Sequence, residues 1–144
     1  MKTILLIHGP NLNALGKRDK KFYGSLTLTQ LVSRVKSYAK SFGLKILPFQ
    51  SNFEGALINF LQNPKHAATG IIINPGALAH YSYALYDAIV DTGVPAVEVH
   101  LSNIKTREAW RRRSVTAAAC KKMISGKKEE GYFEALRYVK KLIK

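Results

Sequence analysis

Residues 70–76 read GIIINPG, and this short stretch decides the fold. Three consecutive isoleucines with no polar alternation indicate a strand that is buried on both faces, as is typical of parallel sheets. The Asn-Pro-Gly that follows ends the strand in a turn. Residues 3–8, TILLIH, repeat the pattern and also run directly into a Gly-Pro-Asn loop. The sequence therefore predicts two buried strands, each followed by a polar loop.

Three further strands are predicted at residues 44–49, 95–99 and 123–124. Helices are predicted between them: from Thr27 to Gly43, from Ser51 to Asn63, and over residues 80–91. Residues 105–119 are expected to be partly helical, and a last helix is expected after Gly131, with Lys140, Lys141 and Lys144 near its end. Thr27 with Gln30 and Ser51 with Glu54 have the spacing of capping boxes.

This alternation of strands and helices predicts an α/β protein with a parallel sheet covered on both faces by helices. Pro48 removes a ladder donor, so the strand at residues 44–49 is expected at a sheet edge. An edge position for the second strand fits the order 2-1-3-4-5 of flavodoxin-like folds. We therefore expect residues 1–144 to form a single flavodoxin-like domain, a three-layer sandwich around five strands.

Composition restricts the setting in which this protein works. Cys120 is the only cysteine, so a disulfide within the chain is impossible and a cytoplasmic location is expected. No apolar stretch approaches the ~20 residues that a membrane span needs. The formal net charge of +14 is compatible with nucleic acid, an anionic membrane surface or an acidic small substrate as the partner.

Polar residues gather in the loops that follow three of the predicted strands. These loops read HGPNLN, NPGALAH and EVHLSN, and the carboxyl ends of parallel strands are where such sheets bind ligands. Each loop by itself is more typical of a simple turn, but three such loops at one end of a sheet favour a functional site. Glu98 and His100 are two residues apart on a strand, so both side chains point to one face, where the carboxylate can orient the imidazole.

The segment of residues 9–24, GPNLNALGKRDKKFYG, resembles a phosphate-binding loop but fails its spacing. Six residues separate Gly9 from Gly16, and no hydroxyl follows Lys17. Gly16 and Gly24 instead suggest hinges of a lid that carries Arg18 and Tyr23. A neighbouring arginine, Arg18 or Arg111, would favour the phenolate of Tyr23 as a base. The alternative is a solvated basic loop with an aromatic anchor.

Other chemistries have no sequence signal. HExxH, CxxC and HxxxH spacings are absent, as are GxSxG and GxGxxG. We therefore predict no metal site and no dinucleotide, which leaves acid–base chemistry or no chemistry.

Five motifs in register resemble type II 3-dehydroquinate dehydratase. They are GPNLN, the RxxxxYG spacing of residues 18–24, QSN with EG at 50–55, INPGAxAH at 73–80, and EVHLSNI followed by RE and Arg111. The resemblance implies a lyase of the shikimate pathway that needs no cofactor and converts 3-dehydroquinate to 3-dehydroshikimate and water. It also implies a homododecamer built from trimers, with no membrane and no specific nucleic acid as partner.

The resemblance carries roles over to individual residues. It implies Tyr23 as the base, Arg18 as its activator, His100 as the general acid, Glu98 as the group that orients His100, and Asn11 as the holder of a water beside the enolate. The residues that it implies in substrate binding are Asn74, His80, Asp87, Leu101, Ser102 and Arg111, with Asp87 reaching the site of a neighbouring subunit. His80 and Asp87 are two helical turns apart, or ~10 Å, which is consistent with Asp87 serving across an interface.

Two other classes of function remain open from the residues alone. Basic clusters at residues 17–21, 111–113, 121–122 and 127–128 could form a surface that follows nucleic-acid phosphates. No known nucleic-acid motif accompanies them. The second alternative, a flavodoxin-like protein that binds a nucleotide, has less support, because the first loop lacks the spacing of a phosphate-binding loop.

Overall fold

The computed structural model describes residues 1–143. Its sheet consists of β1 (Lys2–His8), β2 (Leu44–Gln50), β3 (Ala68–Asn74), β4 (Ala96–His100) and β5 (Lys122–Ser125). All neighbouring strands are parallel and the order is β2-β1-β3-β4-β5. The flavodoxin-like order is thus confirmed, and so is the edge position of β2, which carries Pro48.

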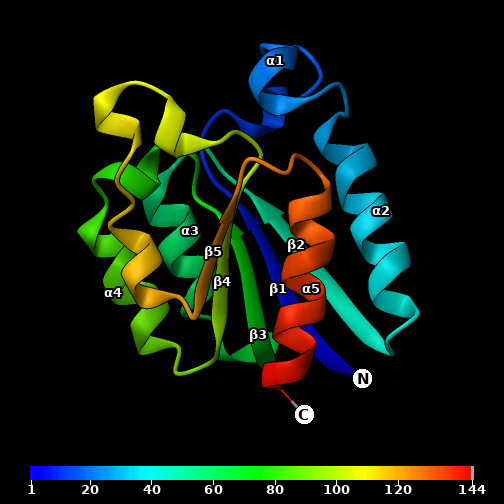
Figure 1. The fold of residues 1–144 in the computed structure, drawn as a ribbon. Coiled ribbons are helices and arrows are strands. Elements are labelled where there is room, and N and C mark those ends of the chain that lie inside the picture. The colour runs from blue at the N-terminus through cyan, green and yellow to red at the C-terminus, as the bar shows by residue number, and fades with distance from the viewer. Residues whose placement is uncertain (144) are drawn as a thin grey trace.

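Helices cover both faces of the sheet (Figure 1). Helices α2 (Leu28–Lys40) and α5 (Glu130–Leu142) lie on one face, and α3 (Glu54–Leu61) and α4 (Tyr83–Asp91) lie on the other. The isoleucines of β3 divide between these layers, because Ile72 packs with α2 and α5 whereas Ile71 and Ile73 pack with α3 and α4. A strand in the middle of such a sandwich has no solvent face, which explains its uninterrupted apolar run.

Short helical elements occupy the connections. Helix α1 (Lys20–Tyr23) lies beyond the carboxyl ends of the strands (Figure 1). Six 3-10 turns, all within residues 1–143, make up the remainder: η1 (Leu12–Ala14), η2 (Pro64–His66), η3 (Gly76–His80), η4 (Ile104–Thr106), η5 (Ala109–Arg111) and η6 (Thr116–Ala119). Three of these turns account for the partly helical stretch expected at 105–119.

One predicted helix cap is confirmed and another is wrong. Thr27 and Gln30 form the reciprocal capping box at the start of α2. Ser51 and Glu54 do not form one, because Phe53 is the N-cap of α3. The Ser51 hydroxyl instead accepts from the backbone of Phe53, and the Glu54 carboxylate accepts from the Ser82 hydroxyl at 2.5 Å.

Two helix starts also differ from the sequence prediction. The helix expected at residue 80 begins at Tyr83, because Ser82 caps it by accepting from the Leu85 amide. The last helix begins at Glu130 and includes Gly131 in its first turn, where a Cβ would lie 3.3 Å from Val99. Lys144, expected at the end of this helix, lies outside the described residues. None of the helices within residues 1–143 has both the length and the apolar character that crossing a membrane requires.

The loops after β1 and β3 fit against each other backbone to backbone. A Cβ on Gly9 would lie 2.1 Å from the carbonyl oxygen of Pro75, and one on Gly76 would lie 2.8 Å from that of Pro10. Only glycine allows so close an approach. The Gly9 amide also donates to the Asn74 carbonyl at 2.8 Å. The two Pro- and Asn-containing loops therefore form one surface at the carboxyl end of the sheet.

Candidate active site

A small polar cleft lies at the carboxyl ends of β1, β3 and β4, where the sheet topology predicts a ligand site. Nine of the eleven predicted site residues line it: Asn11, Arg18, Tyr23, Asn74, His80, His100, Leu101, Ser102 and Arg111. Glu98 lies behind His100 and contacts it directly. Asp87 is exposed on α4 and is not among the residues that line the cleft.

Tyr23 enters the cleft from α1, a helix that the sequence did not reveal. The Asp19 carboxylate caps this helix by accepting from the Lys21 amide at 3.0 Å. The Arg18 guanidinium stacks on the Tyr23 ring, 3.7 Å from its centroid. The phenol oxygen itself accepts a hydrogen bond of 2.7 Å from Nη1 of Arg107.

Arg107 is the main site residue that the sequence prediction did not include. Its side chain is only 8% exposed, and its guanidinium also lies over the Phe22 ring, 4.1 Å from the centroid. Nη1 reaches Ser102 Oγ at 3.4 Å, and Nε has no hydrogen-bond partner among the described residues. In the sequence, Arg107 is the arginine of the Arg-Glu pair that follows EVHLSNI. Its contact with Tyr23, which lies 84 residues earlier, could not be predicted from the spacing of the residues.

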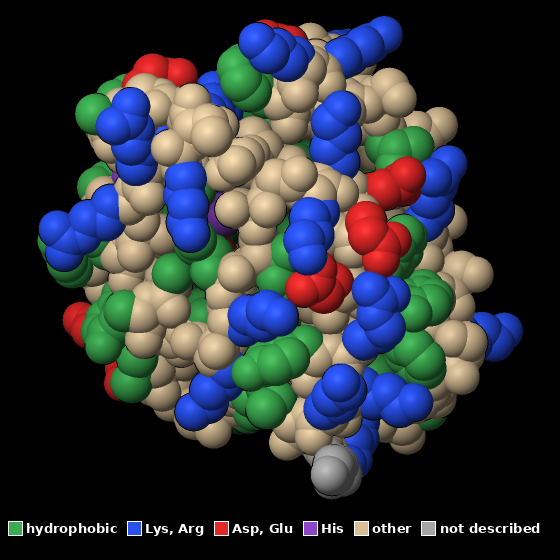
Figure 2. Space-filling model, viewed as in Figure 1, with side chains coloured by type: hydrophobic (Ala, Val, Ile, Leu, Met, Phe, Trp, Pro, Cys, Tyr) green, Lys and Arg blue, Asp and Glu red, His purple; other side chains and the backbone are tan. Residues whose placement is uncertain are grey.

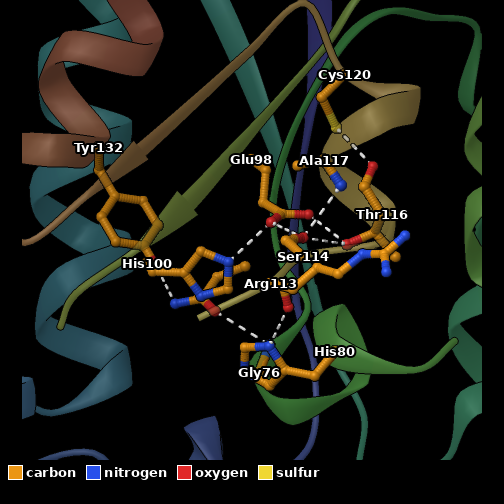
Figure 3. Close-up of polar contacts among 11 residues, drawn as sticks. Gly76, His80, Glu98, His100, Arg113, Ser114, Thr116, Ala117, Cys120 and Tyr132 are labelled. Carbon is orange, nitrogen blue, oxygen red and sulfur yellow. Dashed lines mark hydrogen bonds and ion pairs between the residues drawn. The ribbon is translucent and has the colours of Figure 1, made fainter. Parts of the chain in front are cut away.

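His100 is held by a buried carboxylate (Figure 3). Its Nε2 lies 2.8 Å from Oε2 of Glu98, and both side chains are almost fully buried. The same oxygen accepts from Ser114 Oγ at 2.5 Å, and the other carboxylate oxygen accepts from the Thr116 hydroxyl. Because Nε2 faces Glu98, the ring presents Nδ1 as its other polar atom.

His80 lies across the cleft from His100, with the ring centroids 6.3 Å apart. Its Nδ1 donates to the carbonyl of Arg113 at 2.7 Å, which leaves Nε2 as an acceptor. Burial lowers the pKa of His80 below its usual value, the neighbouring His100 and Arg111 lower it further, and the Arg113 carbonyl opposes them. His80 is therefore a neutral group that can accept a hydrogen bond at neutral pH.

Asn74 is fixed by a buried chain beneath the cleft. Its amide nitrogen donates to the Tyr132 hydroxyl at 3.0 Å, and its carbonyl oxygen accepts from the Gly76 amide at 3.1 Å. The Tyr132 hydroxyl then has its proton free for Nε2 of His8, 3.0 Å away. Burial lowers the pKa of His8 to about 3 and raises that of Tyr132. All three groups are thus neutral, and the Asn74 amide has one orientation.

The remaining predicted residues of the cleft are Arg111, Asn11, Leu101 and Ser102. Arg111 is held by Glu108, whose Oε2 lies 2.5 Å from its Nε, and it stacks on the Trp110 ring at 4.0 Å. Asn11 adopts a positive φ of 70°, and its backbone N–H donates to the side-chain oxygen of Asn52 at 3.0 Å. Leu101 and Ser102 are buried at the end of β4. Within residues 1–143, no three His, Cys, Asp or Glu side chains are grouped to hold a metal ion.

Together the cleft offers a phenol beside guanidinium groups, an imidazole on a buried carboxylate, and neutral hydrogen-bonding groups between them. Such a set can remove one proton and deliver another without water as the base or acid. The fold and this cleft define a flavodoxin-like protein that is equipped for acid–base catalysis.

Comparison with known proteins gives the family. Residues 2–140 match the model of the family described as dehydroquinase class II. The chain is 51% identical over 142 residues to a 3-dehydroquinate dehydratase of Clostridium perfringens, covering 98% of this chain and 97% of that protein. It is 49% identical over 139 residues to the one of Thermotoga neapolitana, covering 96% and 94%. The type II dehydroquinase structure from Butyrivibrio crossotus matches with a TM-score of 0.93 and 41% identity over 96% of this chain and 97% of that chain. The chain therefore belongs to the class II dehydroquinase family.

Proposed function

We propose that this cleft dehydrates 3-dehydroquinate to 3-dehydroshikimate and water, with Tyr23 as the base and His100 as the acid. The observation that carries the proposal is that the Tyr23 phenol and the His100 imidazole line one cleft, each with a charged partner suited to its role. Membership of the dehydroquinase family supports the dehydration step itself, which belongs to the shikimate pathway.

The first step is removal of a proton from the carbon next to the ketone. Only about one tyrosine in a thousand is a phenolate at pH 7, so using it as a base costs roughly 4 kcal/mol unless its surroundings favour the anion. Arg107 donates to the Tyr23 oxygen, and Arg18 places a second positive charge over the ring. These contacts support a phenolate that takes the proton and leaves an enolate on the substrate.

The second step is loss of the hydroxyl from the carbon beyond the enolate. The enolate electrons re-form the ketone and create the conjugated double bond, while the C–O bond to the hydroxyl breaks. His100 gives the leaving oxygen its proton, so the products are the enone and water. The Glu98 carboxylate supports this role by fixing the ring and compensating the charge of the imidazolium.

The other cleft residues would bind the substrate and stabilise the enolate. Asn11 would hold a water against the enolate oxygen, where stabilisation of charge matters most. Asn74 and the neutral His80 have defined orientations that suit substrate hydroxyls. Ser102, the backbone at Leu101, and Arg111 would take the substrate carboxylate. Two proton transfers and the departure of the hydroxyl complete this reaction, so the proposal includes no metal or organic cofactor. It places the enzyme in the cytoplasm.

The proposal extends to a homododecamer of trimers. Asp87, exposed on α4, lies on one helix face with Tyr83 and Val90, which are 64% and 49% exposed. An apolar face around a carboxylate supports a contact through which Asp87 reaches the cleft of a neighbouring subunit. Native mass spectrometry should give a twelve-subunit mass, and a monomer mass would contradict this part of the proposal.

The test of the proposed function is direct. Incubation with 3-dehydroquinate should produce ultraviolet absorbance from the conjugated enone. Borohydride added with the substrate should leave the activity intact, because no lysine Schiff base forms. Absence of enone at any protein concentration would refute the function, and inactivation by borohydride would refute the mechanism.

A further inference from the structure

Glu98 carries a carboxylate in the middle of the sheet, with none of its surface exposed. It lies on β4 between Ile73 of β3 and Met123 of β5. A buried carboxylate is strongly unfavourable unless hydrogen-bond donors or a cation surround it. His100 supplies one donor, which leaves three or so acceptor positions that the imidazole cannot fill.

Two hydroxyls, that of Ser114 after η5 and that of Thr116 at the start of η6, occupy two of the remaining positions (Figure 3). Ser114 Oγ lies 2.5 Å from Oε2 of Glu98, and the Thr116 hydroxyl binds Oε1. The segment that carries them is anchored to η3, because the Val115 amide donates to the Ala79 carbonyl at 2.7 Å.

Both hydroxyls donate to the Glu98 carboxylate. Ser114 Oγ also accepts from the Ala117 amide at 3.1 Å and lies 3.2 Å from Oγ1 of Thr116. Thr116 is fully buried, so its hydroxyl is not in contact with bulk solvent. Neither residue lines the cleft. Both therefore act on the site only through Glu98.

We propose that Ser114 and Thr116 are positioning residues whose hydroxyls share the charge of the Glu98 carboxylate and hold its Oε2 against Nε2 of His100. This inference rests on the proposed role of His100 as the acid. It assigns to the 114–116 segment a control over how strongly His100 holds its proton, without any contact with the substrate.

The charged and titratable groups around the pair come from η3, η5 and the segments after η4 and η6. His80 of η3 faces the His100 ring, and Arg111 of η5 and Arg107 line the same cleft. Cys120, which follows η6, donates to the Thr116 carbonyl at 3.6 Å. Burial, and then the charge of Glu98, raise the pKa of this thiol, so it stays protonated throughout the working range. None of these groups changes in the variants below.

Removal of one hydroxyl should make His100 a weaker and less well-oriented acid. With one donor fewer, the carboxylate concentrates its charge on the imidazolium, which then holds its proton more tightly. Because the acid must carry its proton, its loss sets the alkaline limb of the pH–kcat profile. That limb should move to higher pH by roughly 0.5 to 1 unit, and kcat should fall by roughly 5- to 30-fold.

Four variants distinguish the effect of losing a hydroxyl's hydrogen bond from the effect of changed packing. Thr116→Val and Ser114→Ala delete the hydroxyls, and Thr116→Ser keeps one at the same place. Thr69→Val is the matched control, since it deletes a half-buried threonine hydroxyl that donates to the Thr3 carbonyl at 3.1 Å, far along the chain from the cleft. For each protein kcat, KM, the pH–kcat profile and the melting temperature are measured with 3-dehydroquinate.

We expect Thr116→Val and Ser114→Ala to lower kcat and shift the alkaline limb with KM changed less than about twofold, because the substrate contacts remain. Thr116→Ser should restore both values, and Thr69→Val should lose stability alone. Parent-like kcat and pH profile in Thr116→Val would overturn the inference. So would an equal loss in Thr116→Ser, because the effect would then belong to packing.

A second measurement decides the question without turnover. Nitrogen-15 spectra of the imidazoles, with His100 assigned by comparison with His100→Asn, report its tautomer and its titration. The parent should carry the neutral proton on Nε2, and the midpoint should rise in Thr116→Val but not in Thr69→Val. If the parent does not dehydrate 3-dehydroquinate, the proposed function fails while this measurement still tests the positioning role, and identical midpoints would refute it.

Discussion

At Tyr23, two arginines approach one phenol in different ways. Arg18, the activator expected from the sequence, stacks on the ring, whereas Arg107 donates to the oxygen. The guanidinium of Arg18 places a positive charge against the face of the ring. The guanidinium of Arg107 stabilises a phenolate more directly, because it donates a hydrogen bond to the oxygen that carries the negative charge. The sequence predicted Arg18 as the partner of Tyr23, whereas the pairing with Arg107 depends on a loop that folds back from 84 residues further along the chain.

The first prediction at the residue scale concerns Arg107. Arg107→Lys keeps the charge but loses the planar fork that reaches both Tyr23 and Ser102. We expect kcat to fall on the order of a hundredfold, as for removal of one preorganised donor. The control is Arg113→Lys, because the Arg113 side chain is exposed and contributes only its carbonyl to the site. Equal turnover in the two variants would remove Arg107 from the mechanism.

The second residue-scale prediction concerns His8 and acid stability. Its pKa is about 3 in the fold against 6.5 when exposed, so the unfolded chain binds more protons between these values. The stability that neutral His8 provides is therefore complete above pH 6.5 and is lost as the pH falls toward 3. The contribution to the slope approaches about 1.4 kcal/mol per pH unit.

Urea unfolding at one protein concentration between about pH 4 and pH 7 measures this slope. His8→Gln keeps an acceptor for Tyr132 but cannot titrate, so its free energy of unfolding should fall less steeply with acid than that of the parent. The lowered pKa of His80 acts equally on both proteins. Parallel profiles would show that His8 does not carry the effect.

Among the elements, those with strong periodicity were predictable and those fixed by tertiary contact were not. Buried runs identified β1 and β3, and Pro48 correctly placed β2 at the edge. The box at Ser51 was wrong because Phe53 is the N-cap of α3, and the Glu54 carboxylate binds the Ser82 hydroxyl instead. Helix α1 was not predicted because its four residues are too few to show the helical repeat of apolar side chains. The polar loops after β1, β3 and β4 line one cleft because parallel topology brings the carboxyl ends of these strands together.

A prediction at the element scale concerns the contact between the loops after β1 and β3. Gly9→Ala would drive a methyl group into the Pro75 carbonyl, 2.1 Å away, so the two loops must separate. We expect the free energy of unfolding to fall by roughly 3 kcal/mol or more, with turnover lost because Asn11 and Asn74 no longer face one cleft. Gly55→Ala is the control, since its Cβ meets no atom within 4 Å and lies in helix α3. Gly55→Ala should be neutral or stabilising, and an equal loss in both variants would contradict the account.

On the scale of the whole molecule, the net charge of +14 is the feature that needs an explanation. Figure 2 shows Lys and Arg side chains spread over the face that carries α5, with Asp and Glu between them rather than one unbroken patch. Several are already paired, including Arg34 with Glu129, Lys127 with Glu134 and Arg137 with Glu130. This arrangement favours a general attraction of anions over a track for nucleic acid.

The prediction is that positive charge steers the anionic substrate. Raising salt from about 0.02 M to about 0.5 M shortens the Debye length from roughly 20 Å to roughly 4 Å. We expect kcat/KM to fall several-fold over this range while kcat stays constant, because salt slows only the association of the substrate with the enzyme. A kcat/KM that does not respond to salt would assign the charge to another purpose. Salt-sensitive retention of RNA by a protein without dehydratase activity would favour the nucleic-acid alternative.

The account as a whole depends on the Tyr23 phenol as the group that takes the proton from carbon. The most direct measurement is the kcat of Tyr23→Phe on 3-dehydroquinate beside Tyr81→Phe, which removes the hydroxyl of a 63% exposed tyrosine outside the cleft. We predict that Tyr23→Phe folds with a parent-like melting temperature and loses at least about a hundredfold in kcat, whereas Tyr81→Phe keeps parent turnover. A Tyr23→Phe enzyme that turns over as fast as the parent would mean that another group removes the proton.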